Sequence, residues 1–179
     1  MNPIPSAWLS KCKMERIILH WSEGRRTSND TDRKAYHLLV EHPVNAQARM
    51  IRGDKTIADN LSTKDGVYAA HTQGCNTGSI GLALCGMMQC RETPFHSGPH
   101  PFTPEQWDLM CQAAAQLCKF YGIPCDAKHV LAHGEVQSSL GIKQNGKWDP
   151  MRLPWDPSLS PANVMVRTRN LITSYLAKL

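Results

Sequence analysis

The sequence lacks any run of apolar residues long enough to cross a membrane, and its amino terminus lacks the basic start and apolar run of a signal peptide. We therefore expect no stable membrane insertion, and synthesis in the cytoplasm. The chain also lacks an arginine-rich arm and any recognised nucleic-acid motif. Its net charge of +5 comes from scattered residues, which argues against a nucleic-acid partner and leaves an acidic polymer or an ordinary soluble surface as alternatives.

No Cys-x-x-Cys pair is present, although the chain contains seven cysteines. An odd number without such pairs argues against a zinc ribbon, a thioredoxin-like motif and a fully paired disulfide framework. Cys111 and Cys118 fall on one face of an expected helix, about 10.5 Å apart along its axis, which is too far for them to bond each other. We interpret the thiols mainly as buried small hydrophobic groups.

The length of 179 residues, with 41% hydrophobic and 20% charged residues, is typical of one globular domain. Apolar runs rich in branched residues predict strands at residues 16–21, 35–41, 48–52, 79–86 and 129–133. The turn-like sequence between the second and third of these predicts antiparallel pairing. Together these runs predict an α/β fold with a mixed central sheet, flanked by helices, in a single domain of residues 1–179.

Two helices have clear start signals. Thr103 is a predicted N-cap followed by proline, and Gln106 completes a capping box, while Gly122 ends the helical pattern. A Ser-Pro pair starts a second helix at about residues 160–178, with its apolar side chains along one face. The polar segment 22–33 predicts a loop or a short helix.

Three residues of types that bind zinc lie beside predicted strand ends or in a loop, namely His20, His133 and Asp149. Hydrolytic zinc sites use three such ligands and leave a fourth position to water. Each residue also has an ordinary structural interpretation: a strand-end histidine hydrogen-bonded in the core, or the turn-forming aspartate of an Asp-Pro pair. In the same way, Lys147 fits a solvated loop and Tyr36 a half-buried strand position.

Six short motifs occur in the order, and at about the spacing, of the zinc-dependent N-acetylmuramoyl-L-alanine amidases, and the sequence resembles that family. The family includes phage lysis amidases, wall-recycling amidases and peptidoglycan recognition proteins. The motifs are IILHWS, AYHLLVE, HTQGCNTGSIGLALCG, TPEQ, AHGEV and KWDP. The resemblance covers about residues 14–156, and it implies the fold of this family, with the helix at about 160–178 packed on that core.

Carried over by position, the resemblance implies that His20, His133 and Asp149 bind Zn²⁺. Lys147 matches the lysine that stabilises the oxyanion, and Tyr36 matches a tyrosine that orients the attacking water or relays a proton. These residue types suit amide hydrolysis, because zinc makes hydroxide available near neutral pH and a nearby cation stabilises the developing negative charge.

The loop HTQGCNTG supplies two further expected site residues, His71 and Asn76, as contacts to substrate. A structural role for His71 in the loop is equally open. Glu135 is expected to hold His133 in one tautomer, a common arrangement beside zinc. The segment between His133 and the third ligand is longer than in the shortest relatives, so the site depends on this loop returning to His133.

One departure concerns the strand Ser-Ile-Gly-x-Glu, whose glutamate is the catalytic acid or base in the recycling branch; here the position is Ala83. The phage-like branch is therefore favoured. The expected function is hydrolysis of the amide between N-acetylmuramic acid and L-alanine in peptidoglycan by a monomeric phage or prophage endolysin, acting in the host periplasm after release. The alternatives are a cytoplasmic muropeptide-recycling amidase and a non-catalytic peptidoglycan-binding module.

Overall fold

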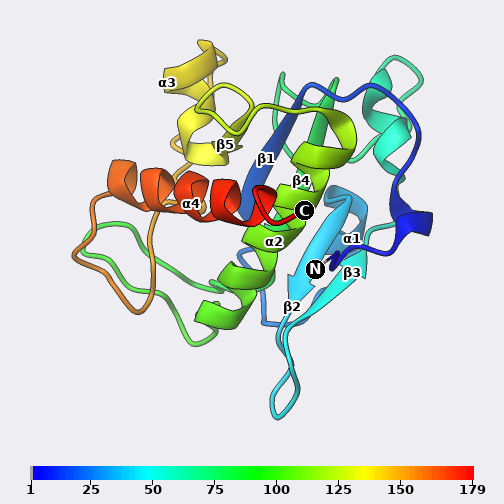
Figure 1. The fold of residues 1–179 in the computed structure, drawn as a ribbon. Coiled ribbons are helices and arrows are strands. Elements are labelled where there is room, and N and C mark those ends of the chain that lie inside the picture. Colours follow the sequence, from blue (N-terminus) through cyan, green and yellow to red (C-terminus); the bar gives the residue numbers. More distant parts are fainter. Residues whose placement is uncertain (1) are drawn as a thin grey trace.

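Five strands form one mixed sheet in the computed structural model, which describes residues 2–179 (Figure 1). They are β1 (Arg16–Trp21), β2 (Leu38–Glu41), β3 (Arg49–Arg52), β4 (Ser79–Leu84) and β5 (Val130–Ala132). Their order is β3-β2-β4-β1-β5; β3 is antiparallel to β2, and the other neighbours are parallel. The predicted α/β class, the mixed sheet and the antiparallel pairing of the second and third strands are confirmed.

The second strand begins three residues later than predicted. Residue 35 belongs instead to helix α1 (Asp30–Ala35), which begins in the segment 22–33, where a loop or a short helix was expected, and ends two residues beyond it. Asn29 caps this helix: its side chain accepts from the Asp32 N–H at 2.9 Å, and the Asp32 carboxylate accepts from the Asn29 N–H at 3.1 Å. This capping box stabilises a polar helix too short to show an apolar pattern.

The longer helices begin where their cap residues predict. They are α2 (Pro104–Tyr121) and α4 (Pro161–Leu176); α3 (Val136–Leu140) and the 3₁₀ turns η1 (Ser6–Trp8), η2 (Ile57–Leu61) and η3 (His133–Glu135) are shorter. Thr103 and Gln106 form the expected reciprocal capping box at 3.1 and 3.2 Å. The Gln106 amide also donates to the carbonyls of Val40 and Cys85 at 2.8 Å, so the cap attaches α2 to β2 and to the end of β4.

Helices α2 and α4 lie on one face of the sheet, with α4 crossing α2 (Figure 1). Alternate residues of β1, Ile17, Leu19 and Trp21, belong to the main core that these helices cover. Ile18 packs in a separate cluster on the other face, and successive strand side chains alternate between faces. His20 is therefore directed to the face opposite α2, and among residues 2–179 the long helices α2 and α4 both lie on the other face.

All seven cysteines are free thiols, and Cys75, Cys85, Cys111 and Cys118 are buried. Burial raises the pKa of the Cys111 thiol well above its ordinary value, so this group is an unreactive part of the core. The interpretation of the cysteines as mainly buried hydrophobic groups is confirmed.

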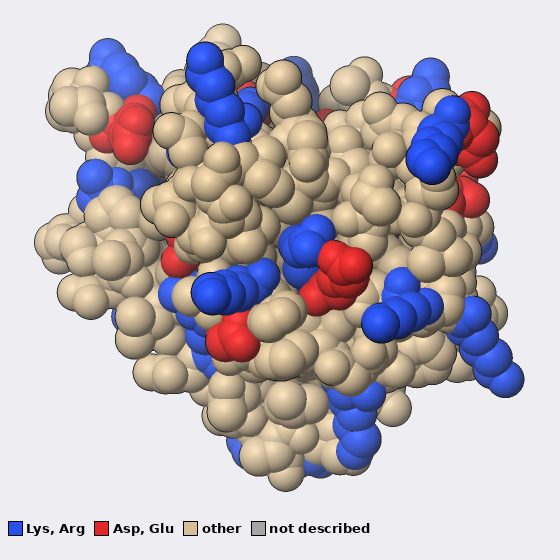
Figure 2. Space-filling view, turned by 90° about the horizontal axis from the view of Figure 1, so that it is seen from above, with Lys and Arg blue, Asp and Glu red and all other residues tan. Residues whose placement is uncertain are grey.

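Charged side chains are dispersed over the surface. On the face seen in Figure 2, lysines and arginines stand apart among uncharged residues, and some lie beside acidic side chains. Across residues 2–179, none of the helices combines the length and the apolar character that crossing a bilayer requires.

Candidate functional site

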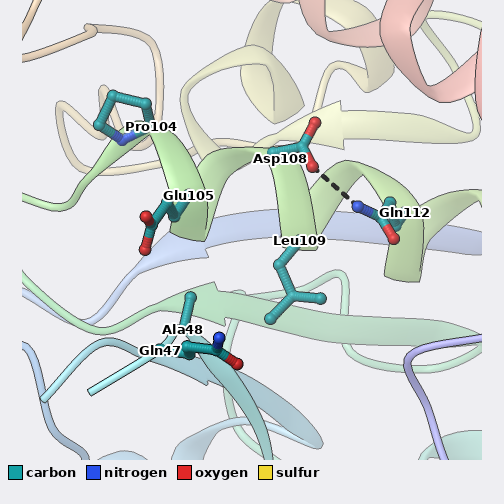
Figure 3. Close-up of a pocket in the computed structure, with 7 residues that line it drawn as sticks. All are labelled: Gln47, Ala48, Pro104, Glu105, Asp108, Leu109 and Gln112. Atoms are coloured by element: carbon teal, nitrogen blue, oxygen red, sulfur yellow. Dashed lines mark hydrogen bonds between the residues drawn. The ribbon is translucent and has the colours of Figure 1, made fainter.

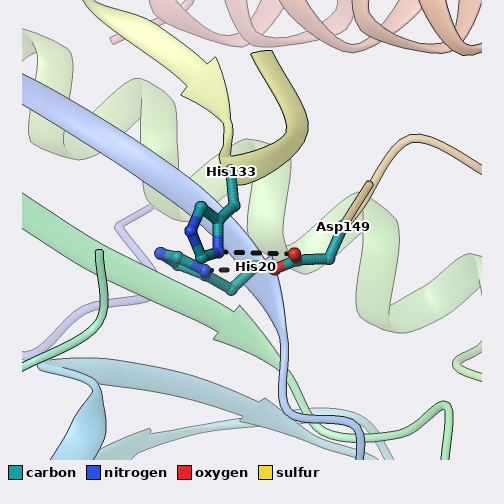
Figure 4. Close-up of side chains that lie close together, drawn as sticks. All are labelled: His20, His133 and Asp149. Atoms are coloured by element: carbon teal, nitrogen blue, oxygen red, sulfur yellow. Dashed lines mark hydrogen bonds and ion pairs between the residues drawn. The ribbon is translucent and has the colours of Figure 1, made fainter. Parts of the chain in front are cut away.

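Three side chains distant in sequence meet beside the carboxyl ends of two neighbouring parallel strands. His20 is the penultimate residue of β1 and His133 directly follows β5, and their ring centroids lie 4.8 Å apart. Asp149 approaches from the segment before α4, with its Oδ2 3.1 Å from Nδ1 of His20 and its Oδ1 3.3 Å from Nδ1 of His133. All three point toward one another (Figure 4), and one donor atom from each lies within 4.8 Å of the others.

A close backbone approach brings Asp149 back to His133. The Gly134 N–H donates to the Asp149 carbonyl at 2.9 Å. A side chain at Gly134 would meet Met151 Sδ at 2.5 Å and Trp148 Cα at 2.9 Å, so the two segments touch only because this residue is glycine. Trp148 also packs edge-on against Trp21 at 4.6 Å between centroids. The long loop therefore does return to His133, as the site requires.

The ring nitrogens of His133 have distinct partners. Its Nε2 lies 2.9 Å from Oε1 of Gln144, and the Gln144 amide nitrogen donates to the Gln73 carbonyl at 2.9 Å, which sets the orientation of the amide. Because Oε1 only accepts, His133 must donate through Nε2. A neutral His133 ring then presents the lone pair of Nδ1 to Asp149.

His20 shows the same arrangement through His71. The Nε2 of His71 lies 3.4 Å from the Ser79 carbonyl and its Nδ1 lies 3.2 Å from Nε2 of His20, with Thr72 Oγ1 also close to both rings. If His71 donates to Ser79, its Nδ1 accepts from His20, and the Nδ1 of His20 carries a lone pair toward Asp149. In both rings Nδ1 is therefore a hydrogen-bond acceptor, and the Asp149 carboxylate that it faces is an acceptor as well.

Burial sets the protonation of this group. It lowers the pKa of His20 to about 4, because a fully buried imidazolium loses its hydration and Asp149 compensates only in part. Burial raises the pKa of Asp149, whereas a proton on a ring nitrogen that faces the carboxylate would lower it. A carboxylate facing neutral imidazole lone pairs repels them unless a cation lies between, so this donor set fits a divalent metal ion.

The expected role of Glu135 beside His133 is wrong. Its carboxylate accepts from the Ala132 N–H at 2.9 Å and pairs with both terminal nitrogens of Arg169 at 2.9 and 3.1 Å, so it caps the η3 turn and faces α4. Gln144 takes that role instead. Sequence reasoning missed Gln144 because a single amide in an irregular loop shows no pattern that reveals its partner.

Tyr36 and Lys147 both lie at this group. The Tyr36 ring is 5.0 Å from the His20 ring, and its hydroxyl is 3.4 Å from the Trp21 carbonyl. Ala83 pairs with His20 in the sheet, and Tyr36 packs against the small cluster to which Ala83 belongs. Lys147 is exposed and borders the same cavity. Their expected chemical roles remain predictions.

His71 and Asn76 serve the loop and also border the cleft. His71 is buried behind His20, and the Asn76 side-chain oxygen accepts from the backbone N–H groups of His71 and Thr72 at 3.1 and 2.8 Å. Both residues line a cavity that also includes Lys147. Substrate contact by these two residues therefore remains a prediction.

The group of His20, His133 and Asp149 lies under a polar cleft made of two adjoining cavities. One, of about 220 Å³, is directly above the group and is lined by Trp21, Ser22, Glu23, Tyr36, Ala70, His71, His133, Lys147 and Asp149. The other, of about 380 Å³, shares Ala70, His71, His133 and Lys147 and adds mainly amide side chains and Tyr68. The cleft thus offers hydrogen bonds on both sides of Lys147, which suits an extended polar substrate.

A larger hollow of about 510 Å³ lies elsewhere, between the first turns of α2 and the segment before β3 (Figure 3). It is lined by Gln47, Ala48, Pro104, Glu105, Asp108, Leu109 and Gln112. Within it, Gln112 donates to Asp108 at 2.7 Å. The hollow contains none of the clustered histidines, and its size alone does not make it the reactive site.

A glycine in β4 makes room for His71. A Cβ at Gly81 would lie 2.6 Å from Cγ of the His71 ring, so Gly81→Ala is expected to lower the free energy of unfolding by about 1–3 kcal/mol through overpacking. Urea unfolding measures this change. In a His71→Ala background the same substitution should cost much less, and an equal cost in both backgrounds would contradict the proposed clash.

Comparisons with known proteins indicate the family and the fold of the chain. A family model described as N-acetylmuramoyl-L-alanine amidase matches residues 10–152. The structure of Staphylococcus aureus hydrolase AmiA in complex with its ligand is similar with a TM-score of 0.54 and 15% identity, covering 92% of this chain and 76% of that one. PlyL aligns with a TM-score of 0.46 and 15% identity, covering 98% and 94% of the two chains. No curated protein sequence matches the chain.

Proposed function

Since the chain belongs to the N-acetylmuramoyl-L-alanine amidase family, we propose that it is a zinc-dependent hydrolase that cleaves the amide between N-acetylmuramic acid and L-alanine in peptidoglycan. The observation that carries this proposal is the buried group of His20, His133 and Asp149, whose acceptor atoms converge beneath a polar cleft. Two imidazoles and one carboxylate are a donor set of hydrolytic zinc sites.

Each residue of the site has a part in this reaction. Zinc held by His20, His133 and Asp149 would lower the pKa of a bound water toward ~7 and polarise the substrate carbonyl. Lys147, exposed at the cleft, would stabilise the negative charge that develops on the carbonyl oxygen. Burial raises the pKa of Tyr36, so its phenol stays protonated and would orient the attacking water by a hydrogen bond.

Mass spectrometry of digested peptidoglycan tests the proposal. Purified protein incubated with sacculi should release stem peptides with a free L-alanine amino terminus and leave lactyl carboxyl groups on the glycan. His20→Ala protein should produce neither. New reducing sugar ends, or cuts within the stem peptide, would show a different hydrolase and contradict the proposal.

We further propose an endolysin-like enzyme that acts as a monomer, through one amidase domain of residues 1–179, on intact cell wall after release into the periplasm. Ala83 supports this, because it stands where the recycling branch has its catalytic glutamate. Assays of sacculi beside soluble anhydro-muropeptides separate the alternatives. A strong preference for the soluble substrate would favour the recycling enzyme.

Gln144 gives a prediction for metal affinity. Gln144→Leu removes the acceptor that holds His133 with Nδ1 toward Asp149, and it should weaken zinc binding by about 10–100-fold. Competition with a chromogenic chelator measures this affinity. Gln112→Leu, on α2 and outside the cleft, is the matched control and should bind zinc normally. Equal affinities of the two variants would refute the role of Gln144.

A further inference from the structure

Glu23 has a strained backbone at the edge of the cleft. Its φ of 58° lies in the left-handed region, which is unfavourable for a residue with a long side chain. The turn is held on both sides: Ser22 Oγ accepts from the N–H groups of Gly24 and Gly86 at 3.2 Å, and the Gly24 carbonyl accepts from Met88 at 2.9 Å. Strained residues that neighbouring contacts hold in place are concentrated at functional sites.

This conformation places Glu23 on the cavity above His20, His133 and Asp149. Glu23 is exposed, and within residues 2–179 its carboxylate has no hydrogen-bond or ion-pair partner. It also lies close enough to Tyr36 for its negative charge, after burial and the charges of Asp149 and Asp32, to raise the pKa of that phenol. An unpaired carboxylate is thus held at the reaction cavity by the backbone.

The other groups that line this cavity are poor proton acceptors. Both ring nitrogens of His71 already face neighbouring polar atoms, and Ser22 accepts two backbone hydrogen bonds. Tyr36 is a protonated phenol and Lys147 is a hydrogen-bond donor. Among the described residues lining this cavity, Glu23 carries the one carboxylate outside the His20–His133–Asp149 group.

We propose that Glu23 is a catalytic residue that transfers the proton during amide hydrolysis, an inference that rests on the proposed amidase function. As the water oxygen bonds to the lactyl carbonyl carbon, one water proton passes to the Glu23 carboxylate. Glu23 then donates this proton to the alanine nitrogen as the C–N bond breaks. The products are the muramic carboxylic acid and the free amino group of L-alanine. Glu23, in the turn that follows β1, would thus supply the carboxylate that is absent at Ala83 on the adjacent strand β4.

Glu23→Gln keeps the shape of the side chain and removes its basicity. With a soluble N-acetylmuramoyl-L-alanyl peptide as substrate, kcat should fall by about 10²–10⁴-fold while KM stays unchanged. Zinc content and the thermal midpoint should match those of the wild type, because the carboxylate holds no other residue in place. This split between kcat and KM separates proton transfer from substrate binding.

Glu23→Gly tests the strain and the chemistry together. Glycine accepts the positive φ, so the thermal midpoint should rise by about 2 °C although the activity is lost. Added formate should partly restore the rate of this variant, since it supplies a carboxylate in the vacated space. Gln89→Gly is the matched control: Gln89 also has a positive φ, of 57°, is exposed and does not line the cleft, so the variant should gain stability and keep full activity.

Three results would overturn the role of Glu23: a Glu23→Gln kcat within about 3-fold of wild type, a raised KM at constant kcat, or loss of bound zinc. Failure of the amidase function itself looks different, because wild-type protein would then leave the lactyl–alanine amide intact. The thermal comparison of Glu23→Gly with Gln89→Gly needs no substrate, and it tests the strain in either case.

Discussion

Replacing Asp149 with asparagine is expected to weaken zinc binding by more than ~100-fold and to reduce amide hydrolysis to background. The asparagine side chain has nearly the same shape, but it lacks the negative charge that faces Nδ1 of both His20 and His133. Zinc content after dialysis, chelator competition and release of L-alanine amino termini measure the two losses. Wild-type zinc affinity in the variant would rule out Asp149 as a ligand.

The same substitution should not destabilise the metal-free protein. In the wild type a buried carboxylate faces ring nitrogens with lone pairs, whereas the asparagine amide can donate to one of them. The metal-free variant should therefore unfold at an equal or higher temperature than the metal-free wild type. Asp156→Asn is a matched control, because Asp156 pairs with Arg167 outside the site; it should retain both zinc and activity.

Replacing Arg169 with methionine is expected to lower the free energy of unfolding by about 3 kcal/mol, or the thermal midpoint by roughly 6–12 °C. Arg169 pairs through two nitrogens with Glu135 and donates to the Val130 carbonyl at 3.2 Å, and the two charged side chains are only 14% and 12% exposed. Methionine fills similar volume but leaves the Glu135 carboxylate without its cation. Thermal and urea unfolding measure the loss.

Arg167→Met is the matched control on the same helix. Its partner is Asp156, both side chains are more exposed, and the loss should stay below about 1 kcal/mol. Adding Glu135→Gln to Arg169→Met should recover part of the lost stability, because no unpaired charge then remains. Equal destabilisation by both arginine variants would contradict a special contribution from the Arg169–Glu135 pair.

Local chemistry made much of the fold predictable. The capping box of Thr103 and Gln106 marked the start of α2, and the branched apolar run of residues 16–21 marked β1. The predicted start of β2 was wrong because Ala35 suits either a helix or a strand. The cap at Asn29 places Ala35 in a helix, but that helix is short and polar and shows no apolar pattern in the sequence. Prediction from sequence was thus accurate where a pattern extends over several turns or a whole strand.

The residues of the site likewise divide into those that a sequence pattern reveals and those that it does not. His20 lies at the end of one apolar strand and His133 follows another, and the two strands are parallel neighbours. Their meeting could be expected from parallel strand ends, with the family resemblance adding Asp149. Gln144 and Glu23 could not be found in this way. The role of Gln144 requires the loop to fold back on His133, and that of Glu23 depends on one backbone dihedral angle.

The contact between Gly134 and Asp149 also bears on how this cleft could vary in size. This contact holds together the two ends of the loop formed by residues 135–148. The ends therefore stay in place whatever the length of the loop. Closing a flexible loop of twice the length costs only ~0.6 kcal/mol more. Insertions near the tip of this loop, away from Gln144, would therefore reshape one wall of the cleft without moving His133 or Asp149. The loop is thus a position at which substrate preference could be altered.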